Sequence, residues 1–154
     1  MSLVPPLPVT LRPLHDADMP ALTGMWVASW RDVFPDIDFE ARRAWFAARM
    51  AAHRADGVQV VVAERAGALL GCITIDAATH FIDQLAVAPA ALGRGVAQAL
   101  LAEARRHSPL QLLLDVNEAN GRALRFYARE GFVVVGEGTS EASGLRLLRL
   151  EWVG

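Results

Sequence analysis

A glycine-containing stretch near the middle of the chain has the residue types and spacing that phosphate binding requires. The stretch runs from Leu92 to Ala97, contains Gly93 and Gly95, and follows an expected strand that ends at Val87. Free N–H groups and the positive end of the dipole make a helix start a binding site for anions. Because glycine lets the backbone approach a phosphate closely, the stretch predicts a phosphate-binding loop or, alternatively, a simple turn.

A dinucleotide-binding fold is a competing interpretation of this stretch. That fold needs Gly-x-Gly-x-x-Gly directly after a strand and an acidic residue about 20 positions later. Gly93 and Gly95 fit, and Asp115 lies at a suitable distance, but Gln98 occupies the third glycine position. The loop after Val87 is also too long for the tight turn, so the sequence disfavours this fold.

Hydrophobic spacing predicts the elements that must position these residues. The expected strands cover 9–14, 58–65, 69–77, 80–87, 110–116, 132–137 and 145–152, and the expected helices cover 17–33, 39–54, 95–106 and 120–129. This order is typical of an α/β or α+β domain with helices on both sides of a mixed sheet. The run 110–116 is almost purely apolar, so we expect it to be buried on both faces.

The composition excludes several classes of protein. A chain of 154 residues with 53% hydrophobic residues predicts one folded domain over 1–154. The net charge of −2 argues against a nucleic-acid-binding protein. One cysteine, Cys72, excludes an internal disulfide, and the four histidines lack metal-ligand spacing, so no metal is expected. With no signal-peptide pattern and no apolar run of about 18 residues, we expect a cytoplasmic location and no membrane association.

Two segments of the chain together resemble the GNAT superfamily of acetyl-CoA-dependent N-acetyltransferases. The family's pyrophosphate loop has the form Gln/Arg-x-x-Gly-x-Gly/Ala, to which residues 92–97 are similar, except that Leu92 replaces the usual Gln or Arg. The second signature is matched by Asn120, Ala123, Phe126, Tyr127, Gly131 and Phe132. The resemblance covers roughly 58–137 and implies a mixed, mostly antiparallel sheet of about six or seven strands flanked by about four helices.

The resemblance also implies how acetyl-CoA is bound. Backbone groups of Leu85 and Val87 would pair with the pantetheine arm as an added strand. Backbone N–H groups from Gly93 onward would hold the pyrophosphate, and Asn120 would contact the pantetheine arm, cap the following helix, or do both. The expected cofactor-binding residues are Leu85, Ala86, Val87, Leu92, Gly93, Arg94, Gly95, Val96, Ala97, Asn120, Ala123, Phe126 and Tyr127.

Three residues are candidates for proton transfer in such an enzyme. Tyr127 would protonate the departing thiolate of coenzyme A, unless it is only an amphipathic core aromatic. The amine must lose a proton before it attacks, and Asp83 and Asp115 are the candidate acceptors. The alternatives are a surface charge at a strand end for Asp83 and a carboxylate that caps the loop 117–120 for Asp115.

The connection between the first two helices is the candidate acceptor site. The sequence places Trp30, Asp32, Phe34 and Asp36 there, followed by Asp38. Aromatic faces and carboxylates together suit a cationic amine. The alternative is that Asp38 caps a helix while Asp32 and Asp36 are solvated loop residues.

These roles predict an N-acetyltransferase that moves an acetyl group from acetyl-CoA to a primary amine. The amine, of a small molecule, peptide or protein, would attack directly within a ternary complex. The alternative from another class is a coenzyme A-binding sensor or interaction module without catalysis. A homodimer is a further expectation from the resemblance.

Overall fold

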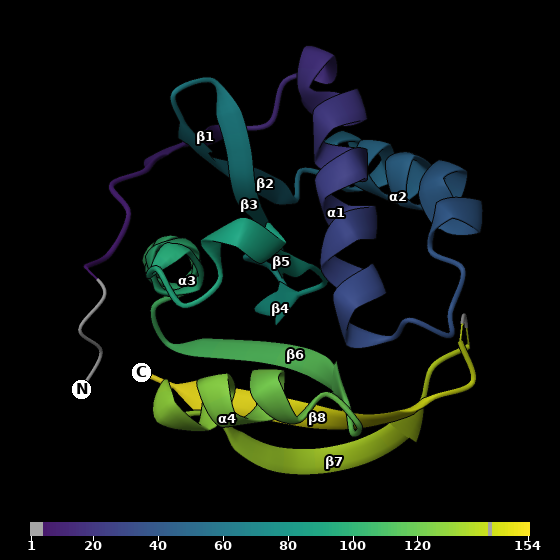
Figure 1. Cartoon of the computed structure of the whole chain (residues 1–154). Coiled ribbons are helices and arrows are strands. Elements are labelled where there is room, and N and C mark those ends of the chain that lie inside the picture. Colours follow the sequence, from purple (N-terminus) through teal and green to yellow (C-terminus); the bar gives the residue numbers. More distant parts are fainter. Residues whose placement is uncertain (1–4, 142) are drawn as a thin grey trace.

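The strands of the computed structural model form two sheets, described for residues 5–141 and 143–154 (Figure 1). The first sheet is antiparallel and has the order β1 (Thr10–Pro13), β2 (Gln59–Arg65), β3 (Ala68–Ile75) and β5 (Leu85–Val87). The second has the order β4 (Phe81–Ile82), β6 (Gln111–Asn117), β8 (Arg146–Val153) and β7 (Val133–Thr139). Only the pairing of β4 with β6 is parallel among these strands, so the predicted mixed, mostly antiparallel fold is confirmed.

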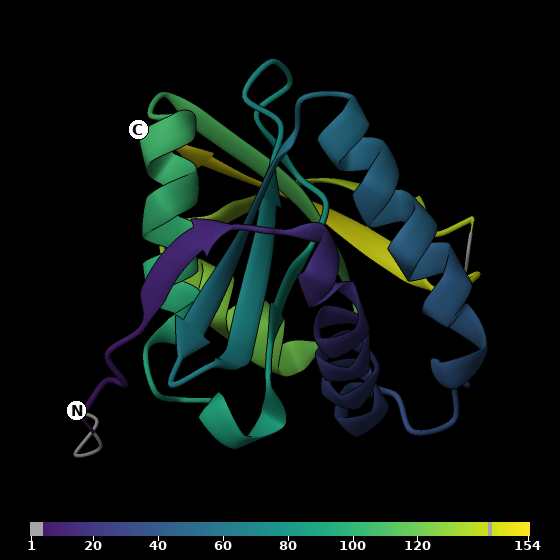
Figure 2. The same ribbon diagram turned by 90° about the horizontal axis from the view of Figure 1, so that it is seen from above.

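Helices cover both faces of the first sheet. The described helices are α1 (Met19–Val33), α2 (Arg43–Ala55), α3 (Val96–His107) and α4 (Gly121–Arg129). Figure 2 shows α1 and α2 on one side of this sheet and α3 on the other, while α4 lies along β6 and β8 of the second sheet (Figure 1). Side chains of a strand alternate between its faces, and therefore Val60 and Val62 pack with α1 and α2 while Val61 and Ala63 pack with α3.

The strand expected over 80–87 is divided between the two sheets. Phe81–Ile82 pairs with β6, whereas Leu85–Val87 pairs with β3. Between them, the buried Thr74 hydroxyl accepts hydrogen bonds of 3.0 Å from the N–H groups of both Asp83 and Gln84. The chain thus leaves one sheet and enters the other at Asp83, and β5 and β6 diverge beyond that point.

The expectation that the strand over 110–116 is buried on both faces is wrong. Leu112, Leu114 and Val116 are buried in the core with α3 and α4, but the alternate residues face the other side, where Asp115 is exposed. On that face, the Gln111 side chain donates a hydrogen bond of 2.6 Å to Glu151 of β8. The strand is therefore buried on one face only, and the residues on its other face are partly exposed or, at Asp115, exposed.

The ends of the helices follow local capping. Asn120 Oδ1 accepts the N–H of Ala123 at 3.2 Å, which confirms the predicted cap of α4. Asp38 Oδ1 accepts the N–H of Ala41 at 3.2 Å, and the α-helix begins only at Arg43, after the short turn of 3-10 helix Glu40–Arg42. Asp38 therefore caps this turn and not the α-helix itself.

Three observations bear on the classes that the composition excluded. Cys72 of β3 is fully buried, and burial raises the pKa of its thiol to about 12. Within the described ranges, no three His, Cys, Asp or Glu side chains come close enough together to hold a metal ion. Among the helices described, none combines the length and apolar character needed to cross a membrane.

Candidate active site

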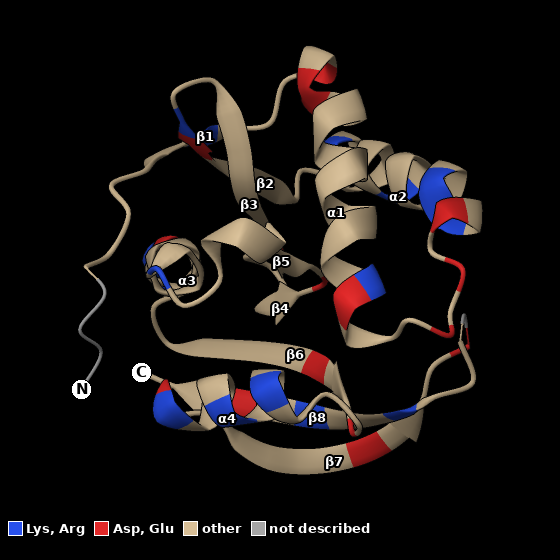
Figure 3. Ribbon diagram, viewed as in Figure 1, with Lys and Arg blue, Asp and Glu red and all other residues tan. Residues whose placement is uncertain are grey.

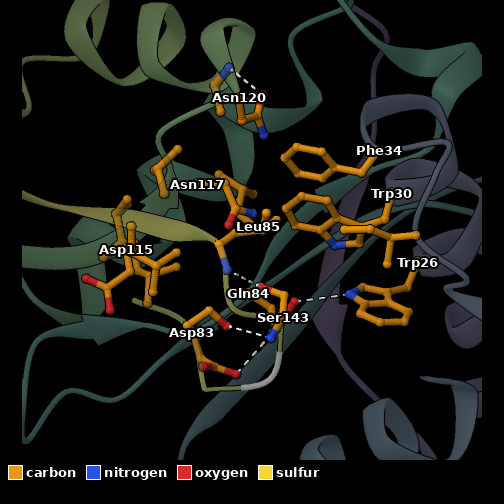
Figure 4. A pocket seen from close by; sticks show the side chains of 18 of the residues that line it. Trp26, Trp30, Phe34, Asp83, Gln84, Leu85, Asp115, Asn117, Asn120 and Ser143 are labelled. Atoms are coloured by element: carbon orange, nitrogen blue, oxygen red, sulfur yellow. Dashed lines mark hydrogen bonds between the residues drawn. The ribbon is translucent and has the colours of Figure 1, made fainter. Parts of the chain in front are cut away.

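A cleft of about 740 Å³ opens where β5 and β6 diverge. Its walls come from α1 and α2, from the strand region 81–85, from β6 and α4, and from the connection between β7 and β8. In the close view, Trp26, Trp30 and Phe34 lie along one side, while Asp115 and Asn117 lie on the other (Figure 4). The cleft therefore joins the two halves of the chain that the sequence assigned to acceptor and cofactor.

Strand β5 presents a free backbone edge to this cleft. Gln84 O accepts the N–H of Thr74 at 3.0 Å, and Ala88 N–H donates to Leu70 O at 2.8 Å, so these residues face β3. Backbone groups of an antiparallel strand alternate in direction, and those of Leu85 and Val87 therefore point away from β3. Since β5 is the last strand in its described sheet, this edge can accept a further strand.

The glycine loop before α3 has the conformation of an anion-binding turn. Gly93 and Gly95 have φ of +73° and +83°, which only glycine adopts readily. Gly95 directly precedes α3, whose first-turn N–H groups have no acceptor within the helix. Arg94 Nε donates to Pro5 O at 3.0 Å, so this side chain is held against the N-terminal segment.

Tyr127 lies in the cleft wall formed by α4. Its ring packs edge-on against Phe126 and Phe132, with centroid distances of 5.2 and 5.3 Å, and it is 7% exposed. Burial raises the pKa of the phenol well above its usual range, so the hydroxyl keeps its proton at neutral pH. Because Tyr127 lines the cleft, a bound ligand can accept a hydrogen bond from its hydroxyl.

Asn120 and Ala123 line the same wall as Tyr127. The Asn120 carbonyl oxygen is occupied by the helix cap, so its amide NH₂ is the part that can meet a ligand. Asn117, at the end of β6, also lines the cleft but was missed from the sequence. Its position directly after an apolar strand was the available signal.

The first candidate proton acceptor, Asp83, is held in an ionic cluster. It accepts two hydrogen bonds of 2.6 Å from Arg49, lies 2.9 Å from His53 Nε2, and accepts a third bond from Gln84. Burial raises the pKa of the Asp83 carboxyl, but the hydrogen bonds from Arg49 and His53 outweigh it and lower the pKa overall. Asp83 is therefore ionised and a weak base, and it is not the free surface charge of the alternative interpretation.

The second candidate, Asp115, lines the opposite wall. Arg149 of β8 donates to it at 2.5 and 3.2 Å, and the Arg149 guanidinium lies 5.2 Å from the ring centroid of Phe81. The loop 117–120 is instead closed by a backbone hydrogen bond of 2.9 Å from Asn120 N–H to Asn117 O. The alternative that Asp115 caps this loop is therefore wrong.

Five aromatic side chains form what we call the aromatic wall: Trp26, Trp30, Phe34, Phe39 and Trp45. Trp30 is stacked on both Phe34 and Phe39, with centroid distances of 5.9 and 5.7 Å. Trp26 Nε1 donates to Gln84 Oε1 at 3.1 Å and so ties the wall to the strand. Trp30 and Phe34 were predicted from the sequence, whereas the other three were missed.

Asp32 and Asp36 do not join the aromatic wall. Both carboxylates are exposed, and neither lines the cleft. The charged residues that do line it from this side are Arg42 and Arg49, and both were missed from the sequence. The only signal for these two residues was their spacing in the helix expected after Asp38, which places both on one face of that helix.

The divided sheet and the glycine loop at the start of α3 agree with the class that the sequence resembles, the acetyl-CoA-dependent N-acetyltransferases. The chain belongs to the Acetyltransferase (GNAT) family, whose model matches residues 19–132. The predictions of this family and of an acyltransferase are thereby confirmed.

Comparison with individual proteins agrees with this assignment. The chain is 29% identical over 137 residues to the peptidyl-lysine N-acetyltransferase YiaC of Escherichia coli, covering 81% of this chain and 84% of that protein. It is 34% identical over 149 residues to the phosphinothricin N-acetyltransferase of Alcaligenes faecalis, covering 82% and 71%. The fold matches PaiA N-acetyltransferase of Thermoplasma acidophilum in complex with coenzyme A, with a TM-score of 0.78, 17% identity, and coverage of 96% and 100%.

Proposed function

We propose that the protein transfers the acetyl group of acetyl-CoA directly to a primary amine within a ternary complex. The observation that carries the proposal is the position of Tyr127 in the wall of the cleft that the free edge of β5 borders. Cys72 is buried away from this cleft, so it is not a nucleophile for a covalent route.

The donor lies along β5 in this proposal. Backbone groups of Leu85 and Val87 pair with the pantetheine arm, and the amide near Val87 polarises the thioester carbonyl. N–H groups from Gly93 to Ala97 hold the pyrophosphate, which they can approach because glycine occupies both positions of positive φ. The free NH₂ of Asn120 completes the contact with the pantetheine arm.

The chemical step needs one proton donor and one route for a proton to leave. The amine nitrogen forms a bond to the thioester carbon, the carbon–sulfur bond breaks, and Tyr127 donates its proton to the sulfur. The proton lost by the amine leaves through water to the solvent, because Arg49 holds the carboxylate of Asp83 and Arg149 holds that of Asp115. Asp83 instead accepts a hydrogen bond from the amine and orients it, since it lines the cleft just before Gln84 and β5.

The two curated relatives are named for different acceptors, a peptidyl-lysine and phosphinothricin. Both names agree with a primary amine as the acceptor here. The aromatic wall supports this acceptor class, because aromatic faces bind the cationic form of an amine before it loses its proton. A cytoplasmic location and a homodimer stay predictions.

Release of free coenzyme A from acetyl-CoA, measured across a panel of primary amines, tests the proposal. We expect turnover with at least one amine and its loss in Tyr127→Phe. If calorimetry shows that acetyl-CoA binds while no amine releases the thiol, the alternative of a non-catalytic binding module is correct instead.

A further inference from the structure

Arg42 is a charged residue of the cleft that the proposed reaction does not use. It ends the short turn Glu40–Arg42 before α2, and its guanidinium carbon lies 5.3 Å from the ring centroid of Phe39. The neighbouring carboxylate, Glu40, pairs with Arg43 at 2.5 Å and with Arg31 at 3.1 Å. Figure 3 shows acidic and basic stretches of the ribbon next to one another where α2 begins.

Arg42 keeps an uncompensated positive charge. None of the carboxylates in residues 5–141 and 143–154 forms an ion pair with it, although it lines the cleft and is half-buried. Arg49, the other cation of this wall, is already neutralised by Asp83. A guanidinium stacked on an aromatic ring keeps its in-plane N–H donors free for a further acceptor.

The charges on the other walls are complementary to Arg42. Asp115 is taken by Arg149, whereas Glu141, on the connection between β7 and β8, has no ion-pair partner among the described residues. The cleft thus offers one unpaired cation and one unpaired anion, with the aromatic wall as the apolar surface. This pattern matches a molecule that carries an amino group and an anionic group on an apolar body.

We infer that the acceptor is a small primary amine that also carries an anionic group, a carboxylate or a phosphinate, which Arg42 binds. The inference rests on the proposed function and names the substrate class of that site. Arg42 forms paired, charge-assisted hydrogen bonds to the two anionic oxygens, and the aromatic wall shields them from water. Arg42 is therefore a specificity-determining residue that leaves acetyl-CoA binding unaffected.

The test compares each amino acid with its carboxamide, which keeps the amino group but lacks the anionic group. The panel contains leucine, methionine, phenylalanine, γ-aminobutyrate and ε-aminocaproate, each beside its carboxamide, together with phosphinothricin, spermidine and a lysine-containing peptide. Coenzyme A release gives kcat/KM for each compound. We expect the best acceptor to be a member with an anionic group, with kcat/KM about tenfold or more above that of its carboxamide or of spermidine.

Arg42→Gln removes the charge, and Arg43→Gln is the matched control. Arg43 is the next residue, is exposed, and pairs with Glu40 outside the cleft. We expect Arg42→Gln to raise the KM of the anionic acceptor about tenfold or more while the KM of its amide and the Kd of acetyl-CoA stay unchanged. In Arg43→Gln we expect the parental ratio of kcat/KM for the acid to kcat/KM for its carboxamide. Arg42→Lys should retain part of this preference, because an ammonium keeps the charge but loses the paired geometry.

The outcomes separate this inference from the function on which it rests. If amides, spermidine or the peptide are acetylated as well as the acids, the amine acetyltransferase stands and the inference is overturned. If folded Arg42→Gln keeps the parental ratio of kcat/KM for acid and amide, the inference is also overturned. If no amine of the panel releases coenzyme A, the proposed function itself fails. Because the ratio in the parent protein is informative alone, an unstable variant does not remove the test.

Discussion

Arg49 donates two hydrogen bonds of 2.6 Å to the carboxylate of Asp83, the residue at which the chain passes from one sheet to the other. This pair joins α2 to the strand region that borders the cleft. It also explains why a carboxylate that the sequence places beside the reaction is a weak base, since the bound cation stabilises its ionised form.

The pair predicts how stability depends on pH. The folded-state pKa of Asp83 lies below its ordinary value of 3.8, so the stabilisation is present above that value and is lost as pH falls through the folded pKa. We expect Asp83→Asn to be less stable than the parent at about pH 5, and the difference to shrink toward about pH 3. Urea unfolding at each pH measures it. A difference that stays constant over this range would contradict the ion pair, because all other titrating groups are common to both proteins.

Tyr127→Phe separates catalysis from packing. The ring and its contacts with Phe126 and Phe132 remain, while the proton donor is lost. General acids contribute about 10²–10⁴-fold, so we expect a loss of that order in kcat with an unchanged Kd for acetyl-CoA. Steady-state kinetics and calorimetry provide the two values. Equal turnover in parent and variant would leave Tyr127 as a packing residue.

Gly95→Val should weaken donor binding. The residue has φ of +83°, and an added Cβ would lie 3.0 Å from Pro6 Cβ, so both backbone and neighbour must move. We expect acetyl-CoA to bind about tenfold more weakly or worse by calorimetry. Gly24→Ala is the control, because that glycine of α1 has open space around its Cβ position. Unchanged affinity in folded Gly95→Val would exclude the loop from the donor site.

Thr74 should control the division of the strand. Thr74→Val keeps the shape but leaves the partly buried N–H groups of Asp83 and Gln84 without this acceptor, at a cost of about 1–3 kcal/mol in the free energy of unfolding. Since β5 directly follows Gln84, we also expect weaker acetyl-CoA binding. Thr74→Ser restores the hydroxyl and should restore affinity. If Thr74→Val binds acetyl-CoA normally, the shape of the divided strand does not depend on this hydroxyl.

The exposed positions of Asp32 and Asp36 predict that they do not bind the acceptor. The double variant Asp32→Asn with Asp36→Asn should keep the acceptor KM within about twofold, because exposed charges outside the cleft are screened. Kinetics at low and high salt test this. A KM that rises at low salt and recovers at high salt would return these carboxylates to the acceptor site.

Local signals in the sequence were sufficient for two structural features of the proposed donor site. Asn120 caps α4 because its own side chain reaches the N–H of Ala123 three residues on. The conformations of Gly93 and Gly95 are likewise a property of residues that tolerate positive φ. Spacing along the chain therefore predicted both features.

Contacts between distant parts of the chain could not be predicted in the same way. Thr74 meets Asp83 and Gln84 only because β3 and the divided strand are neighbours in space, and no residue type marks that hydroxyl as an acceptor. Arg49 and Asp83 are similarly 34 positions apart. Trp26 and Trp30 have the helical spacing of ordinary core residues, so Trp26 could be assigned to the cleft only from the tertiary structure.

Because Cys72 is buried, the rate at which its thiol is modified reports how fast the first sheet opens. Cys72 pairs with Ala86 of β5, and reagents that attack thiolates cannot reach it while the strands are closed. Such reagents therefore detect released coenzyme A without background from the folded enzyme. Left longer with the protein alone, they modify Cys72 only as fast as β3 and β5 separate, and a donor bound along β5 should slow that modification.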